Sequence, residues 1–186
     1  MTTTSSKPRV IVIGNTCAGK TTLGMRLAQR LSLPFIDLDA LFWQPHWQPS
    51  ELTEFRKRVL EATGAPGWVL VGNYTAQQQD ISWARANTVV YLDVALPIVV
   101  SRVLLRSYRR WRSGEVLWGT NYERFFPQLK VWDENSSLVA WAVNHHRERQ
   151  RAYAAALRDT RWQHIEFHRF GSSREADGWL TTFPSR

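Results

Sequence analysis

The chain has 186 residues, a length that suits one α/β domain and leaves no room for a second full domain. Its hydrophobic content of 44% and charged content of 22% are those of a folded globular protein and exclude disorder as the default state. No apolar run approaches the roughly 18–20 residues of a membrane span, and residues 1–7, an expected flexible tail, lack the apolar core of a signal peptide. The lone Cys17 excludes an internal disulfide. We therefore expect a cytoplasmic protein with no membrane partner.

The net charge of +8 is carried mainly by arginine. The planar guanidinium group suits bidentate binding of phosphate, so this composition is compatible with phosphate chemistry. A solvated basic surface that reflects only amino-acid usage is an equal alternative for most of these positions. Only clustered arginines are therefore treated as candidates for a site.

Apolar runs that alternate with helical patterns predict a parallel sheet. Residues 9–14 are almost continuously apolar and end in glycine, which is typical of a central strand covered on both faces. Leucines at every fourth position predict a helix over residues 20–32. Four more strands are expected, at residues 35–39, 68–72, 88–94 and 164–167.

Capping residues and proline indicate three further helices. Ser50 can cap the first of them, and Pro97 suits the first turn of the second. The three helices are expected over residues 50–62, 97–111 and 136–157. Strands that alternate with helices predict a three-layer α/β fold with right-handed crossovers.

Residues 112–133 interrupt this alternation with glycine, proline and aromatic residues. We interpret this stretch as a short mobile lid. The chain contains neither an internal repeat nor a linker rich in Pro, Gly or Ser. We therefore expect a single domain over residues 1–186 that carries one lid.

Residues 14–21, Gly-Asn-Thr-Cys-Ala-Gly-Lys-Thr, fit the phosphate-binding loop pattern G-x-x-x-x-G-K-[ST] between a predicted strand and a predicted helix. The glycines let the backbone curl so that its N–H groups and the positive helix end face the β-phosphate, while Lys20 reaches the β- and γ-phosphates. Thr21 offers its hydroxyl group to magnesium. We therefore predict that the chain binds ATP and Mg²⁺. The expected ATP-binding residues of this segment are Gly14, Asn15, Ala18, Gly19, Lys20, Thr21 and Thr22.

Four features together resemble the adenylate kinase and shikimate kinase superfamily of P-loop kinases over nearly the whole chain. They are the early P-loop, Asp37-Leu-Asp39, Gly72-Asn73-Tyr74 after the third strand, and Arg102-x-x-x-Arg106 before the lid. Residues 38–47, 68–74 and 109–111 look more specifically like the small bacterial DNA topology modulation, or FlaR-like, proteins. The superfamily implies a P-loop NTPase fold with a five-stranded parallel sheet in the order 2-3-1-4-5 and the nucleotide at the carboxyl ends of the strands.

The resemblance also implies roles for acidic and basic residues. By similarity with shikimate kinase, Asp37 would hold magnesium through water, and Asp39 would bind the acceptor hydroxyl group and favour its deprotonation. The alternative is that this acidic pair merely caps the following helix. In adenylate kinases, an arginine pair spaced like Arg102 and Arg106 packs on the adenine and reaches the phosphates.

Arg109, Arg110 and Arg112 continue this cluster toward the lid, where on closure they could neutralise charge on the transferring phosphoryl group. Arg147 and Arg151 share a face of the last long helix, and phosphate binding and an exposed ridge are equal alternatives for them. The catalytic residues that we predict are Lys20, Asp39, Arg106 and Arg110. The ATP-binding residues outside the P-loop are Arg102 and Arg106, and the metal-binding residues are Thr21 and Asp37.

One position departs from the family pattern. Adenylate kinases carry an aspartate before the glycine of the third strand, where this chain has Val71. Magnesium would then depend on Thr21, Asp37, the triphosphate and water, which suits its preference for keeping several waters. Asp93 on the fourth strand is a less favoured substitute.

The sequence therefore predicts a monomeric ATP- and magnesium-dependent kinase that acts on a small-molecule acceptor. Trp43, Trp47, Trp111 and Trp118 fall near the expected acceptor pocket or lid and favour a nucleoside or nucleotide, although packing explains most tryptophans. The alternative is an ATP-binding regulatory protein associated with DNA, suggested by the charge of +8. We favour it less, because no nucleic-acid-binding motif accompanies that charge.

Overall fold

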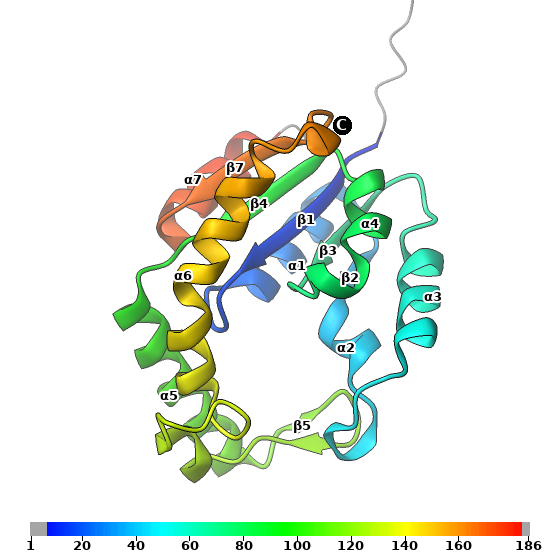
Figure 1. Ribbon diagram of the computed structural model, residues 1–186. Helices are drawn as coiled ribbons and strands as arrows, with labels where there is room; N and C mark the ends of the chain where they lie inside the picture. Colours follow the sequence, from blue (N-terminus) through cyan, green and yellow to red (C-terminus); the bar gives the residue numbers. More distant parts are fainter. Residues whose placement is uncertain (1–6, 184–186) are drawn as a thin grey trace, which may run out of the picture.

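Five parallel strands form the central sheet of the computed structural model, which describes residues 7–183 (Figure 1). Ile11 on the middle strand lies opposite Leu70 on one side and Val89 on the other, so this strand is paired along both edges. In spatial order the strands are β2 (Phe35–Asp37), β3 (Trp68–Val71), β1 (Arg9–Gly14), β4 (Thr88–Leu92) and β7 (Glu166–Phe170). The predicted order 2-3-1-4-5 is confirmed, because β7 is the fifth strand of this sheet along the chain.

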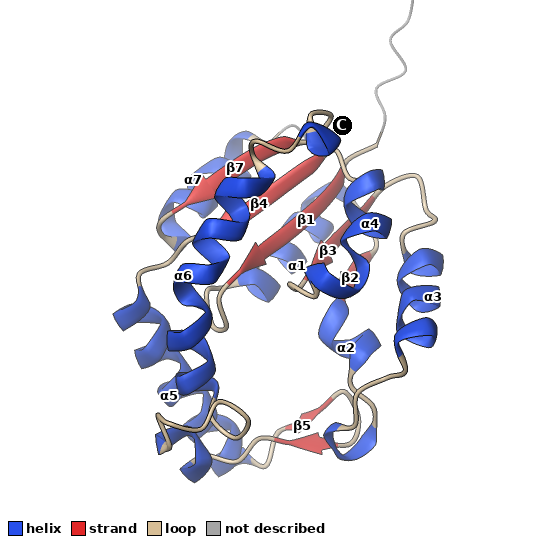
Figure 2. Ribbon diagram, in the orientation of Figure 1, coloured by secondary structure: helices blue, strands red, loops and turns tan. Residues whose placement is uncertain are grey.

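Helices cover both faces of the sheet (Figure 2). Alternate side chains of β1 point to opposite faces, so Val10 and Val12 contribute to one apolar layer while Ile11 and Ile13 contribute to the other. The first layer includes residues of α1 (Lys20–Leu31), α5 (Leu96–Ser113) and α7 (Ser173–Thr182). The second includes residues of α3 (Leu52–Ala62), α4 (Thr75–Arg85) and the end of α6 (Leu138–Ala156). Burial on both faces explains the continuous apolar runs of the central strands.

The segment between α5 and α6 lies beyond the carboxyl ends of the strands (Figure 1). It holds an antiparallel hairpin of β5 (Val116–Leu117) and β6 (Asn121–Tyr122), followed by the short 3-10 helix η2 (Phe126–Leu129). We call residues 112–133 the lid segment. The remaining short elements are α2 (Leu38–Phe42), η1 (Pro45–Trp47) and η3 (Thr160–Trp162). None of the helices between residues 7 and 183 has both the length and the apolar character needed to cross a membrane.

Several predicted strand boundaries are wrong. The third and fourth strands end at Val71 and Leu92, before the predicted positions 72 and 94. The second strand ends at Asp37 rather than Asp39, because the Asp37 side chain accepts a hydrogen bond from the backbone N–H of Asp39 and thereby caps α2. The last strand covers residues 166–170 rather than 164–167. The preceding turn of η3 extends to Ile165, whose backbone N–H donates to the carbonyl oxygen of Trp162, so the strand can begin only after that residue.

Other elements also differ from the prediction. Ser50 does not cap α3, because its hydroxyl group donates to the carbonyl oxygen of Phe42 at 2.8 Å and the helix begins at Leu52. Neither α4 nor α7 was assigned from the sequence. Residues 1–6 of the expected flexible tail lie outside the described residues.

Close approach of α1 to the sheet gives a test of the packing. Ordinarily, alanine in place of a helical glycine stabilises a protein by about 1 kcal/mol. At Gly24 in α1, however, an added Cβ would overlap Cγ1 of buried Val71 and lie 3.1 Å from Cε2 of Phe35. We therefore expect Gly24→Ala to lower the free energy of unfolding, measured in urea, by about 1–3 kcal/mol.

Gly178 in α7 is the matched control, because an added Cβ there meets no atom within 4 Å. Gly178→Ala should leave the free energy of unfolding unchanged or raise it by up to ~1 kcal/mol. If Gly24→Ala is as stable as the unmodified chain, α1 does not pack as closely against β3 as the structure shows.

Candidate active site

The turn after β1 forms the predicted P-loop between the sheet and α1. Gly14 has a φ of 152°, and a Cβ at this position would lie 2.7 Å from the carbonyl oxygen of Leu92 on the neighbouring strand. Gly19, with a φ of 102°, is the residue that precedes the first turn of α1. Both positions therefore need glycine, and together they direct the N-terminus of α1 toward the carboxyl edge of the sheet.

Asn73 fixes this turn from the adjacent strand end. Its side-chain amide donates from Nδ2 to the carbonyl oxygen of Gly14 at 3.0 Å, and its Oδ1 accepts from the backbone N–H of Gly14 at 3.2 Å. Sequence reasoning did not assign Asn73 to the site. Its position in Gly72-Asn73-Tyr74, directly after a strand, was the available signal.

Lys20 folds back over the loop. Its Nζ donates to the carbonyl oxygens of Gly14 and Asn15 at 3.1 and 2.9 Å. The pKa of Lys20 is lowered to about 8, chiefly by burial; the Asp39 carboxylate opposes this shift, and the positive charges of Arg149 and Arg106 contribute to it. A buried ammonium group surrounded by other cations favours the binding of a polyanion such as a triphosphate.

Asn15 connects the P-loop to α6. It is only 3% exposed; its Nδ2 donates to the carbonyl oxygen of Ala142 at 3.0 Å, and its Oδ1 accepts from Arg149 at 2.8 Å. The Arg149 guanidinium group also lies 4.0 Å from the ring centroid of Trp141, and burial lowers the pKa of Arg149 to about 10. The arginine of α6 that reaches the P-loop is thus one that the sequence did not single out.

Arg147 and Arg151, the two arginines of α6 considered from the sequence, are both exposed. The face of α6 that meets the P-loop carries Ala142, His146 and Arg149, whose spacing follows the helical period. Positions 147 and 151 lie off this face. The exposed-ridge alternative therefore describes their placement.

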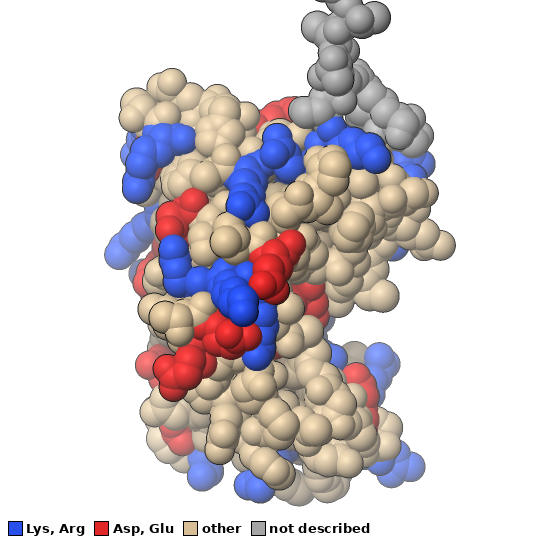
Figure 3. Space-filling view, turned by 90° about the vertical axis from the view of Figure 1, so that its right-hand side faces the viewer, with Lys and Arg blue, Asp and Glu red and all other residues tan. Residues whose placement is uncertain are grey.

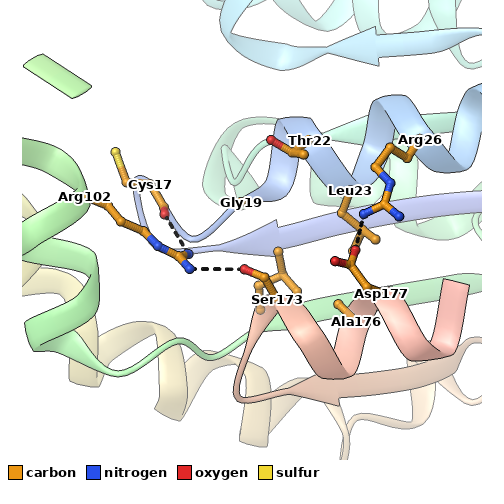
Figure 4. Close-up of a pocket in the computed structure, with 10 residues that line it drawn as sticks. Cys17, Gly19, Thr22, Leu23, Arg26, Arg102, Ser173, Ala176 and Asp177 are labelled. Atoms are coloured by element: carbon orange, nitrogen blue, oxygen red, sulfur yellow. Dashed lines mark hydrogen bonds and ion pairs between the residues drawn. The ribbon is translucent and has the colours of Figure 1, made fainter. Parts of the chain in front are cut away.

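Arg102 borders a cleft of about 290 Å³ between the P-loop, α1 and α7 (Figure 4). Its guanidinium group donates to the carbonyl oxygen of Cys17 at 3.5 Å and to the hydroxyl group of Ser173 at 3.3 Å. Leu23 and Ala176 supply apolar surface. Arg26 also lines the cleft, where it is paired with Asp177. A partly apolar cleft beside the P-loop suits the nucleoside part of ATP. Sequence reasoning missed the contribution of α7, because nothing local indicated where that helix packs.

The only cysteine of the chain lies in this loop. Burial raises the pKa of the Cys17 thiol, although the positive charges of Arg106 and Lys20 oppose the shift. A thiol that stays protonated is a poor nucleophile. We therefore assign Cys17 no catalytic role.

Glu123 of the lid segment pairs with Arg106 and Arg110, whereas Arg109 and Arg112 are exposed. Its side chain is 5% exposed and accepts from Arg110 at 3.0 Å, while Arg106 lies 3.8 Å away and the Ser107 hydroxyl group also donates to it. Arg110 additionally pairs with Glu115 at 3.3 Å. Arg106 and Arg110 are therefore brought together by an acidic residue that the sequence did not single out. The catalytic role of Arg110 stays a prediction, because the transfer would require it to leave this ion pair.

Asp39 lies in the first turn of α2, close to the P-loop. Its Oδ1 accepts a hydrogen bond from the Tyr74 hydroxyl group at 2.7 Å. Burial, followed by the Asp39 charge, raises the pKa of Tyr74, so this hydroxyl group stays protonated and keeps donating. Burial and the neighbouring Asp39 also raise the pKa of Asp37, which caps α2. Asp37 therefore caps α2, as the alternative states, while its metal-binding role and the acceptor-binding role of Asp39 stay predictions.

Three of the four tryptophans that we expected near the acceptor gather at one place. Ring centroids of Trp43 and Trp47 are 5.6 Å apart, and those of Trp47 and Trp118 are also 5.6 Å apart. Trp111 instead packs against Phe126, with ring centroids 5.3 Å apart. The loop that carries Trp43 and Trp47 and the lid hairpin that carries Trp118 therefore share an aromatic surface.

No group of three or more His, Cys, Asp or Glu residues between residues 7 and 183 could enclose a metal ion. Val71 is buried and cannot bind one, and Asp93 is engaged by Gln150 at 2.9 Å and by Arg169. A hydroxyl group from Thr21 and a carboxylate from Asp37 are the hard oxygen donors that Mg²⁺ prefers, completed by phosphate and water. The donor set therefore fits a magnesium ion that arrives with a nucleotide.

The shifted pKa of Lys20 predicts a pH dependence of stability. With a pKa of about 8 in the folded chain and 10.5 as its ordinary value, Lys20 binds fewer protons in the folded than in the unfolded state between these pH values. The free energy of unfolding should therefore rise with pH across this window. Between pH 7 and 10.5, the free energy of unfolding of the unmodified chain, measured in urea, should rise by about 1–3 kcal/mol relative to that of Lys20→Met.

Lys57→Met is the control for this series, because Lys57 is exposed on α3. The difference in free energy of unfolding between Lys57→Met and the unmodified chain should change by less than ~0.5 kcal/mol over the same pH range. If the difference in free energy of unfolding between the unmodified chain and Lys20→Met stays constant across this pH range, the burial of the Lys20 charge is contradicted.

Comparison with known proteins places this site in a family. Residues 16–114 match the family model for shikimate kinase. The structure resembles a shikimate kinase from Bacteroides thetaiotaomicron, with 16% identity, a TM-score of 0.59, and 94% of this chain and 95% of that chain covered.

Two further solved structures share the fold. A shikimate kinase from Acinetobacter baumannii in complex with shikimate has 16% identity and a TM-score of 0.54, covering 95% of this chain and 90% of that chain. A gluconokinase from Sinorhizobium meliloti has 14% identity and a TM-score of 0.52, covering 95% and 93%. No curated protein matches the sequence. Because the matched family model spans more than half of the chain, this protein belongs to the shikimate kinase family of P-loop kinases.

Proposed function

We propose that this kinase transfers the γ-phosphoryl group of ATP to a hydroxyl group of a small molecule held beside Asp39. The observation that carries the proposal is the position of Asp39, which accepts from Tyr74 and lies near enough to Lys20 to raise its pKa against the effect of burial. A carboxylate next to the P-loop lysine suits an acceptor hydroxyl group close to the γ-phosphate.

In this proposal the nucleoside occupies the cleft beside Arg102, and the phosphates lie against the P-loop N–H groups, Lys20 and Arg106. Thr21 would bind magnesium directly and Asp37 through water. When bound, the ion would neutralise charge on the phosphate oxygens.

Asp39 would orient the acceptor hydroxyl group and receive its proton. The hydroxyl oxygen forms a bond to the γ-phosphorus while the bond from that phosphorus to the bridging oxygen breaks, and ADP leaves with the electron pair. The P-loop N–H groups and Lys20 stabilise the negative charge that develops on the leaving phosphate. Charge balance is maintained because the proton moves to Asp39 as the phosphoester forms.

The identity of the acceptor is a narrower question. The structural relatives are named for shikimate and gluconate, both hydroxylated acids, whereas the tryptophans favour a nucleoside or nucleotide. The more specific resemblance to FlaR-like proteins rests on residues 38–47, 68–74 and 109–111, and it stays a prediction. For the DNA-associated alternative, the face in Figure 3 carries acidic residues interspersed among the basic ones, which does not favour a DNA-binding surface there.

The direct test is ADP release from ATP and Mg²⁺ by purified protein, alone and with a panel of hydroxylated small molecules. An acceptor that stimulates release, together with recovery of its phosphorylated form by mass spectrometry, would support the proposal. Tight ATP binding without stimulation by any acceptor would favour the regulatory alternative.

Asp39→Asn tests the assigned role. The amide cannot take the acceptor proton, so kcat should fall about 100-fold or more, while the Kd for ATP should change by less than about threefold. Circular dichroism should show an unchanged fold. The control is Asp80→Asn, which removes an exposed carboxylate paired with Arg56 and should leave kcat unchanged. A normal kcat for Asp39→Asn would remove Asp39 from the mechanism.

A further inference from the structure

An aromatic surface borders the two carboxylates of the proposed acceptor site. We call Trp43, Trp47 and Trp118 the tryptophan wall. Successive rings meet edge to face at interplanar angles of 76° and 89°. Trp47 and Trp118 remain 38% and 36% exposed, so a substantial part of these rings is available for contact.

The wall begins beside Asp39, because the backbone N–H of Trp43 donates to the backbone carbonyl oxygen of Asp39 at 3.0 Å. The Phe42 ring lies between Trp43 and Tyr74, with ring centroids 5.0 and 4.7 Å away. The Tyr74 hydroxyl group in turn donates to the Asp39 carboxylate at 2.7 Å. A molecule that contacts Asp39 therefore meets indole surface on the neighbouring side.

The lid segment completes the wall through Asn121, which is 1% exposed. Its Oδ1 accepts from the backbone N–H of Trp47 at 2.8 Å, and its Nδ2 donates to the carbonyl oxygen of Gln44 at 3.1 Å. Trp47 and Trp118 both adopt positive φ values, 59° and 46°. Tryptophan rarely adopts this backbone conformation, and such strain is typical of functional sites.

The arginines of α3 are engaged by acidic partners. Arg56 pairs with Asp80 at 2.6 Å, and Arg58 pairs with Glu54 at 3.1 Å. Lys20 donates to the carbonyl oxygens of Gly14 and Asn15, and Arg149 donates to the Asn15 side chain, so both cations lie at the P-loop, where the phosphates of ATP are expected. An acidic acceptor on the wall would therefore face Asp37 and Asp39 without a matching cation from α3, and burying an unpaired charge is unfavourable.

We propose that the acceptor is an uncharged molecule with a planar ring and a hydroxyl group, of the nucleoside class, which packs on the tryptophan wall and presents its hydroxyl group to Asp39. This inference rests on the proposed phosphotransferase function. It separates the chain from the acids for which its structural relatives are named. Aromatic rings offer contact area to any planar ring, whereas they carry no positive charge to pair with a carboxylate or a phosphate.

The experiment compares nucleosides, each paired with its 5′-monophosphate, with shikimate and gluconate in the ADP-release assay. At least one nucleoside should give a kcat/KM tenfold or more above that of its monophosphate and of both acids. Trp118→Ala should raise the KM for that nucleoside about tenfold, with the KM for ATP changed less than twofold. Trp118→Phe should reverse most of this rise in KM for the nucleoside, because phenylalanine keeps an aromatic ring. Trp132→Ala is the control, since Trp132 in the same segment is 81% exposed.

The outcomes separate this inference from the function on which it rests. Preferred phosphorylation of an acid or a monophosphate would keep the kinase and overturn the nucleoside assignment. If no acceptor stimulates ADP release, the proposed function fails, and calorimetry with ADP and Mg²⁺ present decides the inference. Nucleoside binding that Trp118→Ala weakens would then support the wall as a binding surface, and absence of nucleoside binding would overturn it.

Discussion

The turn at Gly14 is the constraint on which the rest of the site depends. The backbone there passes so close to Leu92 that a side chain at Gly14 would lie 2.7 Å from a carbonyl oxygen, and both backbone polar groups of Gly14 are taken by the amide of Asn73. Because those groups are satisfied by a neighbouring strand end, the chain can leave the sheet and curl without losing hydrogen bonds. The curl in turn sets the direction of α1, the path of Lys20 across the loop, and the contact of Asn15 with α6.

The electrostatics of the site follow from this geometry. Lys20 and Arg149 are both partly buried and both have lowered pKa values, of about 8 and about 10, chiefly because burial disfavours their charged forms. Such an arrangement disfavours the folded state when no anion is bound and becomes favourable when a polyphosphate neutralises it. Binding of nucleotide should therefore be coupled to stability, since a ligand that binds only the folded chain shifts the unfolding equilibrium.

The sequence was sufficient where the determining contacts are local. The P-loop pattern, the continuous apolar strands and the stripe of leucines on α1 predicted the central strands and the position of the P-loop turn, because each depends on spacing within a few residues. The sheet order came instead from the resemblance to P-loop kinases. Asn73, Glu123 and Arg149 were missed because their roles come from contacts with residues distant along the chain. Asp39 was placed on a strand because an alternating acidic pair fits one, and the local hydrogen bond from its N–H group to Asp37 turned the chain into a helix instead.

The lid segment joins the two halves of the site through buried polar side chains. Glu123 holds Arg106 and Arg110 on the side of the phosphates, and Asn121, two residues earlier, holds the loop that carries Trp47 on the side of the acceptor. A displacement of the lid would thus release Arg110 from its ion pair and separate Trp118 from Trp47 in the same movement. Because buried, hydrogen-bonded carboxylate and amide groups have few satisfactory alternative positions, these contacts favour discrete lid positions over a continuous range. In the proposed mechanism, this arrangement would couple the charge available for phosphoryl transfer to the proposed acceptor surface.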